Sequence, residues 1–423
     1  MKKKSILIIL PWLPYPLTSG GHQALYNGIV AIHKDMDVSL SFAVEDEYQY
    51  LDALEGFSSM LPNVTLYPYY RCKRIADGAK RRKPVKPWYN RLFHAMFPRR
   101  HSFDRVRYWK YCTFPPSREW SMHNQQVIDS NHFDFVQIEM PWLLNTVLGL
   151  SFDGKKIFVH HELGFVRRAQ EMSNTPKEDY DAWTWLRFTD MNEIALLNMY
   201  DAIVTLSSTD TEKLKRAGVT RPVYSSMATI DPKTSLTGNA LATKRLVFMG
   251  PDEHAPNLDG ITWFLENCWK KLREQDAQYT LEIIGKWNDT NIKKIKSQYQ
   301  GVGFCGYVDD LSEAMKGCVM IVPINIGSGI RMKILEAAAR GIPFVSTTVG
   351  AEGIPVKNGT HCFIADEPES FVQSILKLQD VSLRKQMVEN SYQMLRDNFS
   401  IDALRANRLD IYDSVGAERS VCG

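Results

Sequence analysis

The sequence predicts an α/β protein made of two doubly wound domains that face a common cleft. Short apolar runs rich in β-branched residues alternate with amphipathic helical patterns, and this alternation restarts halfway along the 423 residues. Such runs are typical of parallel strands that are covered on both faces. Strand–helix alternation in turn indicates a parallel sheet with helices packed against it. The length also suits two domains better than a single core.

The predicted strands form two sets. The first set comprises residues 5–10, 38–44, 64–70, 133–139, 156–161 and 201–207. The second set comprises residues 245–250, 279–285, 302–307, 319–324, 343–348 and 361–366. Helical patterns lie between the strands, for example over residues 20–34, 258–275, 331–341 and 368–379, and a long one follows over 382–415.

A polar stretch at residues 229–244 separates the two sets and predicts the domain boundary. We therefore expect a first domain over 1–228, a second domain over 229–396, and a C-terminal helix over 397–423 that packs back on the first domain. Ligands of open α/β sheets bind at the carboxyl ends of the strands. The loops that follow the strands 5–10 and 319–324 are thus predicted to face the cleft.

The composition is that of a water-soluble globular protein, with 44% hydrophobic and 23% charged residues. No apolar run approaches the roughly 18–20 residues of a membrane span. The first run, SILIIL, is expected to be a strand and not a signal peptide, because prolines follow it without a cleavage pattern. The seven scattered cysteines favour a reduced cytoplasmic protein over a disulfide frame or a zinc site.

Basic and aromatic residues gather between Arg71 and Lys110, where fourteen lysines and arginines stand against two acidic residues. One interpretation is a solvated helical face. The alternatives are an anionic membrane surface, which would place the protein at the inner face of the membrane, or a phosphorylated partner. No nucleic-acid-binding motif accompanies this segment, so nucleic acid is not expected as a partner.

The stretch PINIGSGIRMKILEAAARGIP, residues 323–343, places Arg331 and Lys333 in the first turn of a predicted helix. A helix N-terminus already carries about half a positive charge and several unpaired N–H groups. Cations there cost stability unless an anion lies with them, and Gly327 and Gly329 let the backbone approach a ligand closely. This pattern predicts a phosphate or diphosphate site.

Glu336 lies on the same helical face as Lys333 and suits the hydroxyl groups of a ribose. The alternative is a local ion pair between Lys333 and Glu336, which would stabilise the helix by only about 0.2–0.5 kcal/mol. Its order along the helix, lysine before glutamate, is also the less favourable one.

The loop after the first strand carries a second glycine pair, Gly20 and Gly21, just before an amphipathic helix. It is not a G-x-G-x-x-G loop, so a dinucleotide site is not indicated. A plain strand-to-helix turn is one interpretation of the pair. Its position across the presumed cleft favours the other interpretation, in which it faces the same anion.

Residues 248–269, 306–354 and PLTSGG at 16–21 resemble a known family. They are similar to the nucleotide-sugar-dependent retaining glycosyltransferases of family 4, which have the GT-B fold. The family pattern G-x-G-[IV]-[KR]-x-K-[IV]-L-E-A is matched from Gly327 to Ala337. The likeness spans nearly the whole chain; it is specific over 246–354 and loose over 45–130.

The resemblance implies that Glu336 binds the ribose of a UDP-, GDP- or dTDP-sugar. The diphosphate would be bound by the amides of Gly329 and Ile330, by Arg331 or Lys333, and by the first-domain glycines from the other side. The implied nucleotide-sugar-binding set is Gly20, Gly21, Gly250, Asn257, Ser328, Gly329, Ile330, Arg331, Lys333 and Glu336.

The sequence departs from the family pattern at two places. Many relatives carry two glutamates in an E-x7-E pair, and here the first falls on Ser328, which leaves the donor sugar unassigned. Many relatives also place an arginine and a lysine in the stretch that corresponds to GPDEHAPN at 250–257. Because this stretch holds neither, Arg331, Lys333 and Lys286 would have to supply the charge.

The strand 156–161 ends in His160 and His161, and relatives often have a histidine near the reacting sugar at this place. Alternation along a strand turns only one of the two toward the cleft, and we favour His161 as the catalytic one. The letters of a metal-binding D-x-D motif occur at Asp35 and Asp37, but we interpret them as a turn, so no metal cofactor is expected. Arg331 would then stabilise the leaving diphosphate together with Lys333.

The resemblance implies a metal-independent hexosyltransferase that retains anomeric configuration. It would transfer the sugar to a hydroxyl of a glycan or lipid-linked glycan, as in the synthesis of cell-surface polysaccharides. Two alternatives stay open. One is a GT-B protein that binds a nucleotide sugar or glycan without turnover, which the serine at 328 favours. The other is a sugar epimerase or phosphorylase with the same fold.

Overall fold

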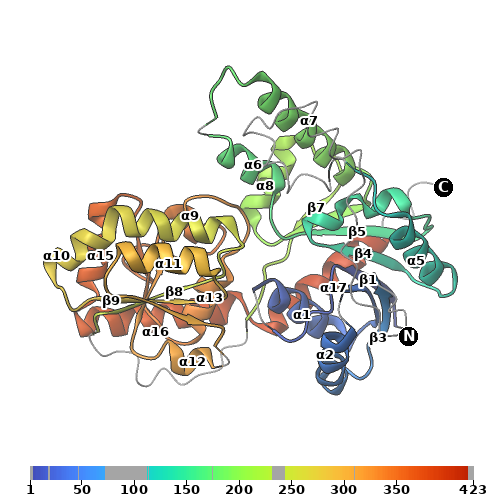
Figure 1. Ribbon diagram of the computed structural model, residues 1–423. Coiled ribbons are helices and arrows are strands. Elements are labelled where there is room, and N and C mark those ends of the chain that lie inside the picture. The colour runs from blue at the N-terminus through green and yellow to red at the C-terminus, as the bar shows by residue number, and fades with distance from the viewer. Residues whose placement is uncertain are drawn as a thin grey trace, which may run out of the picture.

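The protein is described here by a computed structural model, which places residues 3–17, 20–45, 47–71, 112, 114–173, 175–230, 243–308 and 310–417. These residues form two α/β domains, each built on one parallel sheet with helices against it (Figure 1). This confirms the predicted fold class. The stretch 231–242 of the predicted boundary and the basic segment 71–110, apart from Arg71, lie outside the described residues.

The first sheet has the order β3-β2-β1-β4-β5-β6-β7, and all its neighbouring strands run parallel. Its strands are β1 (Ser5–Leu10), β2 (Asp37–Val44), β3 (Thr65–Tyr70), β4 (Phe135–Glu139), β5 (Lys155–His160), β6 (Ala202–Thr205) and β7 (Val223–Ser225). Among the strands within the described residues, the sequence prediction missed only β7, because three residues are too short to show a periodic pattern. The strand order reverses between β1 and β4, which makes their carboxyl ends the switch point of this sheet.

The second sheet has the order β10-β9-β8-β11-β12-β13 and is also parallel. Its strands are β8 (Arg245–Met249), β9 (Thr280–Ile284), β10 (Val302–Gly306), β11 (Val319–Val322), β12 (Phe344–Ser346) and β13 (Phe363–Ile364). Every residue of β11 and β12 is buried. This explains why these strands appear in the sequence as continuous apolar runs without alternation.

Helices cover both faces of the two sheets. In the first domain they are α1 (Gly20–Ile32), α2 (Glu47–Met60), α5 (Arg118–Asp129), η2 (Pro141–Gly149), α6 (Gly164–Glu171), α7 (Tyr180–Leu197) and α8 (Ser208–Ala217). In the second domain they are α9 (Ala255–Phe264), η3 (Leu265–Trp269), α10 (Lys270–Gln275), α11 (Asp289–Gln298), α12 (Leu311–Ala314), α13 (Met332–Ala339), α14 (Thr348–Ala351), α15 (Pro368–Lys377) and α16 (Val381–Asn398).

The central strand β1 shows how the first core is built. Ile6 and Ile8 pack in one hydrophobic cluster with α1, whereas Leu7 and Ile9 pack in another cluster with α5. Successive side chains of a strand point to opposite faces, so one apolar run serves both layers. The all-apolar SILIIL run is therefore a buried strand, as predicted.

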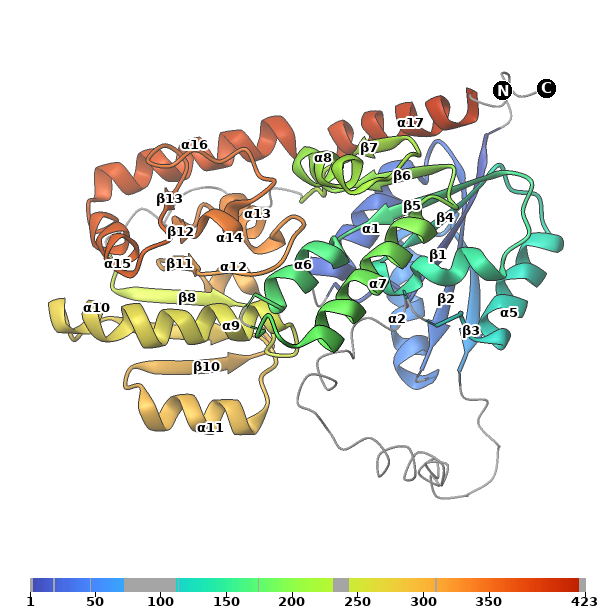
Figure 2. The same cartoon turned by 90° about the horizontal axis from the view of Figure 1, so that it is seen from above.

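The last two helices cross from the second domain to the first (Figure 2). Helix α16 contributes Met387 and Met394 to the core of the second domain. Helix α17 (Ile401–Ala417) lies against α1, and its Ile411 and Val415 belong to the core of the first domain. The chain thus connects the domains at two places. No helix among the described residues is long and apolar enough to cross a membrane.

Candidate functional site

Two helix N-termini meet at the junction of the domains. Helix α1 of the first domain begins at Gly20, and a Cβ atom added to Gly20 would lie 2.9 Å from the Cβ of Met332, where α13 of the second domain begins. Neither helix has an acidic residue in its first turn. Each N-terminus carries about half a positive charge. Positive potential is therefore concentrated where the two helices meet, and an anion would relieve it.

The loop before α13 is docked on the segment that follows β5. The amide of Gly327 donates to Oε1 of Gln170 at 2.5 Å, and the amide of Leu163 donates to Oγ of Ser328 at 2.6 Å. A Cβ on Gly329 would clash with the carbonyl oxygen of His161. Gly327 and Gly329 both have positive φ, at 114° and 79°. The two glycines predicted to let a ligand approach thus also let the first domain approach.

Ser328 faces the first domain. Its side chain is buried, with 5% exposure, and its hydroxyl also lies 3.4 Å from the carbonyl oxygen of Leu163. A serine hydroxyl is short and can both donate and accept. At this position, where many relatives have a glutamate, the side chain therefore joins the domains.

Arg331 caps α13 rather than lying within its first turn, because the helix begins one residue later than predicted. Its Nη1 donates to the carbonyl oxygens of Ser328, with which it makes a short contact, and of Gly329, at 2.6 Å. Its Nη2 is buried and has no hydrogen-bond partner in the part of the chain that the structure describes. Burial lowers the pKa of Arg331, and the nearby carboxylate of Glu162 opposes this. The guanidinium thus stabilises the loop through Nη1, and Nη2 stays available to donate to a ligand.

Lys333 lies in a group with Gly250 and Asn257 of the second domain. Its Nζ donates to Oδ1 of Asn257 at 2.7 Å and lies 4.4 Å from the ring centroid of Phe248. The amide nitrogen of Asn257 donates to the carbonyl of Pro251, which turns the amide oxygen toward the lysine. A Cβ on Gly250 would clash with this Asn257 side chain. Burial, assisted by Arg331, lowers the pKa of Lys333 to about 7.

Glu336 is buried, with 6% exposure, and pairs with Arg340 one turn further along α13. The alternative Lys333–Glu336 ion pair considered from the sequence is therefore not what the structure shows. Ile330 lies in the same loop and packs against the hydrophobic clusters of both domains. Gly21 follows Gly20 in the first turn of α1.

The two histidines at the end of β5 have separate surroundings. His160 is buried, and its Nε2 lies 3.1 Å from Oε1 of Glu193, which also accepts from the amide of Gly164. The Nε2 of His161 lies 2.6 Å from Oε2 of Glu139 at the end of β4. The surroundings of His160 indicate a structural role at the start of α6.

His161 stands at the end of a hydrogen-bonded chain that begins in the C-terminal helix. The hydroxyl of Tyr412 donates to Oε1 of Gln137 at 2.7 Å, and Nε2 of Gln137 donates to Oε1 of Glu139 at 2.6 Å. Because an ionised carboxylate only accepts, the Glu139 contact indicates that Nε2 of His161 carries the proton. In the neutral imidazole its Nδ1 is then an acceptor.

Several residues of the site were missed by the sequence prediction. Burial lowers the pKa of His254 to about 3, and Arg167 from the first domain, Lys333 and Arg331 add to this lowering. His254 lies in GPDEHAPN, a stretch from which the sequence prediction named only Gly250 and Asn257. Arg167 contacts Glu162 at 3.2 Å, and Arg167 did not stand out because it follows β5 without a recognisable spacing.

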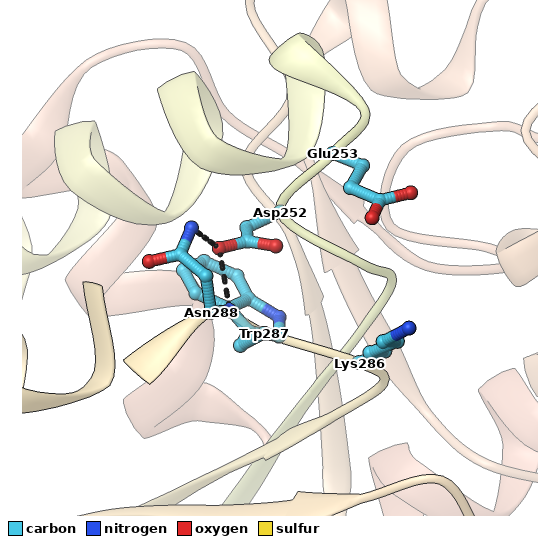
Figure 3. Close-up of a pocket in the computed structure, with 5 residues that line it drawn as sticks. All are labelled: Asp252, Glu253, Lys286, Trp287 and Asn288. Atoms are coloured by element: carbon cyan, nitrogen blue, oxygen red, sulfur yellow. Dashed lines mark hydrogen bonds between the residues drawn. The ribbon is translucent and has the colours of Figure 1, made fainter. Parts of the chain in front are cut away.

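Lys286 lines a separate cavity at the carboxyl ends of β8 and β9, together with Asp252, Glu253, Trp287 and Asn288 (Figure 3). The carboxylate of Asp252 points to Asn288 and accepts from its backbone amide at 2.9 Å. The indole of Trp287 donates to the carbonyl of Gly250 at 2.8 Å. This cavity therefore adjoins the Gly250 end of the site.

No group of His, Cys, Asp or Glu side chains within the described ranges is suited to hold a metal ion. Asp35 of the D-x-D letters lies in a turn and pairs with Arg405 of α17 at 2.5 Å, while Asp37 begins β2.

The likeness to solved structures covers nearly the whole chain. Anabaena HepE in complex with UDP has a TM-score of 0.65 at 12% identity, over 97% of this chain and all of that chain. TarM from S. aureus has a TM-score of 0.68 at 8% identity, over 97% of this chain and 100% of that chain. Sucrose-phosphate synthase from Thermosynechococcus elongatus has a TM-score of 0.68 at 14% identity, over 98% and 100% of the two chains. The fold is therefore GT-B.

Sequence comparison adds a likeness that is confined to the second domain. Residues 243–380, which include the whole GSGIRMKILEA motif, match the family described as glycosyl transferases group 1. The chain thus has the GT-B fold, and its residues 243–380 are similar to the group 1 glycosyltransferases, as the motifs predicted. A Klebsiella pneumoniae protein described as an uncharacterized 44.6 kDa protein in the cps region is 24% identical over 163 residues. That match spans 36% of this chain and 42% of the relative.

The pKa of Lys333 predicts a pH-dependent stability. The unfolded chain keeps a proton on this lysine up to about pH 10.5, whereas the folded chain releases it near pH 7. Because the unfolded state binds more protons in this window, the free energy of unfolding contributed by this site rises with pH. Urea unfolding across the window should show the rise in the wild type and not in Lys333→Met.

The matched control is Lys270→Met, which changes a lysine whose side chain is 85% exposed and should leave the pH dependence as in the wild type. Parallel pH dependences of the wild type and Lys333→Met would contradict the lowered pKa.

Proposed function

We propose that the protein transfers a sugar from a UDP-, GDP- or dTDP-sugar to a hydroxyl of a glycan or lipid-linked glycan, without a metal and with retention of anomeric configuration. The observation that carries this proposal is the meeting of the α1 and α13 N-termini beside Arg331 and Lys333, with no acidic residue in either first turn. A diphosphate is the anion that fits two helix ends and two cations.

In the proposed complex the diphosphate lies between Gly20–Gly21 of the first domain and the amides of Gly329 and Ile330. The arriving charge favours the protonated form of Lys333, so binding takes up a proton above about pH 7. Glu336, one turn into the helix, binds the ribose. Complexes of HepE contain UDP and UDP-glucose, and this supports a nucleotide-sugar donor here.

The chemistry is departure of the diphosphate from the anomeric carbon and attack by an acceptor hydroxyl on the same face. The charge that develops on the leaving oxygen is stabilised by the helix ends and by Arg331 and Lys333, an electrostatic contribution that needs no reorganisation. The acceptor loses its proton to the leaving diphosphate as the new bond forms. Nδ1 of His161 accepts a hydrogen bond from a sugar hydroxyl and so orients the reacting ring.

The cps-region relative supports a role in the synthesis of a cell-surface polysaccharide. We place the protein in the cytoplasm, at the inner face of the membrane, with the basic segment 71–110 toward anionic lipid. The second candidate function is a nucleotide-sugar-binding protein without turnover. It is favoured by Ser328, whose hydroxyl is engaged with Leu163.

Donor binding tests the proposal directly. Calorimetric titration with UDP-, GDP- and dTDP-sugars should reveal one preferred nucleotide. Lys333→Ala and Glu336→Ala should each weaken the affinity for that sugar nucleotide by about tenfold to a hundredfold. The control is Glu389→Ala, an exposed glutamate on α16. Absence of binding to every sugar nucleotide would refute the transferase, and binding without release of free nucleotide would favour the non-catalytic alternative.

The contact between Glu139 and His161 predicts a selective loss of turnover. In Glu139→Gln the amide no longer holds the proton on Nε2, so we expect the kcat of donor hydrolysis to fall by about a hundredfold while KM changes little. The acidic limb of the pH–rate profile should also shift. Glu45→Gln, which changes an exposed carboxylate just beyond strand β2, is the control. An unchanged kcat and pH profile would remove His161 from the mechanism.

Vesicle flotation tests the membrane placement. The protein should float with phosphatidylglycerol vesicles and not with phosphatidylcholine vesicles, because the basic segment attracts anionic lipid. Replacing Arg81, Arg82 and Lys83 with glutamine should reduce flotation. Equal flotation with the two lipids would refute this placement.

A further inference from the structure

We propose that Trp12, Trp142 and His22 form a stacking platform that binds a pyranose ring of the acceptor at the switch point of the first sheet. This inference rests on the proposed function and adds to it a subsite and a class of ligand, a neutral saccharide ring. It concerns the side of the domain junction opposite the nucleotide-binding helix α13.

The two tryptophans come from the two strands that flank the switch point. Trp12 lies two residues beyond Leu10, where β1 ends, and Trp142 lies three residues beyond Glu139, where β4 ends. Strands β1 and β4 are hydrogen-bonded neighbours. Their carboxyl ends form the crevice in which open α/β sheets bind ligands.

The rings are arranged in a row with small tilts. The ring centroids of Trp12 and Trp142 lie 5.6 Å apart and those of Trp12 and His22 lie 5.3 Å apart, with an interplanar angle of 30° in each pair. The side chain of Trp142 is 45% exposed, although a tryptophan in a domain of this size is usually well buried. The row therefore presents an aromatic surface to a ligand.

The platform also contains a polar group, the indole N–H of Trp12, that could donate to a ligand. Nε1 of Trp12 is buried and has no hydrogen-bond partner among the described residues. Tryptophan N–H groups usually find a partner when they are buried. A pyranose ring suits this surface, because its apolar C–H faces can stack on the aromatic rings and the hydroxyls on its edge can accept the hydrogen bond from Nε1 of Trp12.

The position of the platform connects both parts of the proposed reaction. His22 lies two residues beyond Gly20, which touches α13 at Met332. At the other end, Trp142 follows Glu139, whose carboxylate holds His161. A saccharide on these rings would thus lie between the diphosphate site and the histidine.

The backbone between Glu139 and Trp142 is strained. Met140 has φ 77° and ψ 140°, is 4% exposed, and is the one non-glycine residue with positive φ in the part of the chain that the structure describes. Such strain persists where the surrounding structure holds it, and it is often found at functional sites. Here it lets the chain present a carboxylate to His161 and, three residues later, an indole to Trp12.

A nucleobase is the other flat ligand that an aromatic surface attracts. The proposed ribose site at Glu336 lies on α13 of the second domain. The donor-pocket residues Gly250, just after β8, and Asn257, in α9, belong to the same domain. The base is joined to that ribose, so the geometry favours the acceptor over the base on this platform.

Saturation-transfer NMR on the full chain tests the platform with methyl pyranosides of glucose, galactose, mannose, N-acetylglucosamine and rhamnose as probes. At least one probe should receive saturation mainly on the protons of one ring face. Trp142→Ala should weaken its binding by about tenfold or more, and Trp142→Tyr should restore part of it. Tyr180→Ala is the control, since Tyr180 is an exposed aromatic on α7, with 76% exposure, outside this row.

The absence of transfer to every probe in the wild type would overturn the inference, as would equal binding by Trp142→Ala. Displacement of the pyranoside by UDP alone would also overturn it, because the rings would then serve the base. Calorimetry with sugar nucleotides on the same samples separates the two claims. If pyranoside binding depends on Trp142 but no sugar nucleotide binds, the proposed sugar-nucleotide donor is refuted and the saccharide platform is retained.

Discussion

The docking of the 327–331 loop on the segment after β5 is the contact on which the rest of the site depends. Ser328 reaches Leu163, Gly327 reaches Gln170, and Gly329 lies against His161 so closely that a side chain would clash. Because the loop leads directly into α13, this contact sets where that helix begins relative to α1. The carbonyl oxygens bound by Arg331 belong to the same loop. A shift of the loop would therefore move the cation, the helix end and the first domain together.

The positive groups of the site are held by neutral protein oxygens. Arg331 donates to backbone carbonyls, and Lys333 donates to the amide oxygen of Asn257. No carboxylate among the described residues forms an ion pair with either side chain, and burial lowers the pKa of both, which Glu162 partly opposes at Arg331. Such a site is oriented before a ligand arrives and needs little reorganisation to stabilise negative charge. The same feature makes it costly without an anion.

The first domain supplies a second ordered region on the other side of the junction. The C-terminal helix α17 contributes Tyr412, which holds Gln137, and through Gln137 and Glu139 it reaches His161. Residues distant in the sequence thus orient one imidazole, because α16 and α17 lead the chain back from the second domain (Figure 2). The strained Met140 joins this network to the Trp12–Trp142 row. In our proposal His161 orients the reacting sugar, the Trp12–Trp142 row serves the acceptor, and α13 serves the donor.

The sequence alone determined the two parallel sheets, all but one of their strands, and the glycine–cation motif, because buried β-branched runs and helix-start charges are local signals. The order of the strands, and hence the switch point at Trp12 and Trp142, was decided by tertiary structure. So were the separate roles of His160 and His161, which share a strand end but meet Glu193 and Glu139 from different elements. Tertiary structure also decided where Ser328 lies. In the sequence this residue is apparent only as a departure from the family pattern. Its partner Leu163 lies 165 residues away, and no local pattern records a contact over that separation.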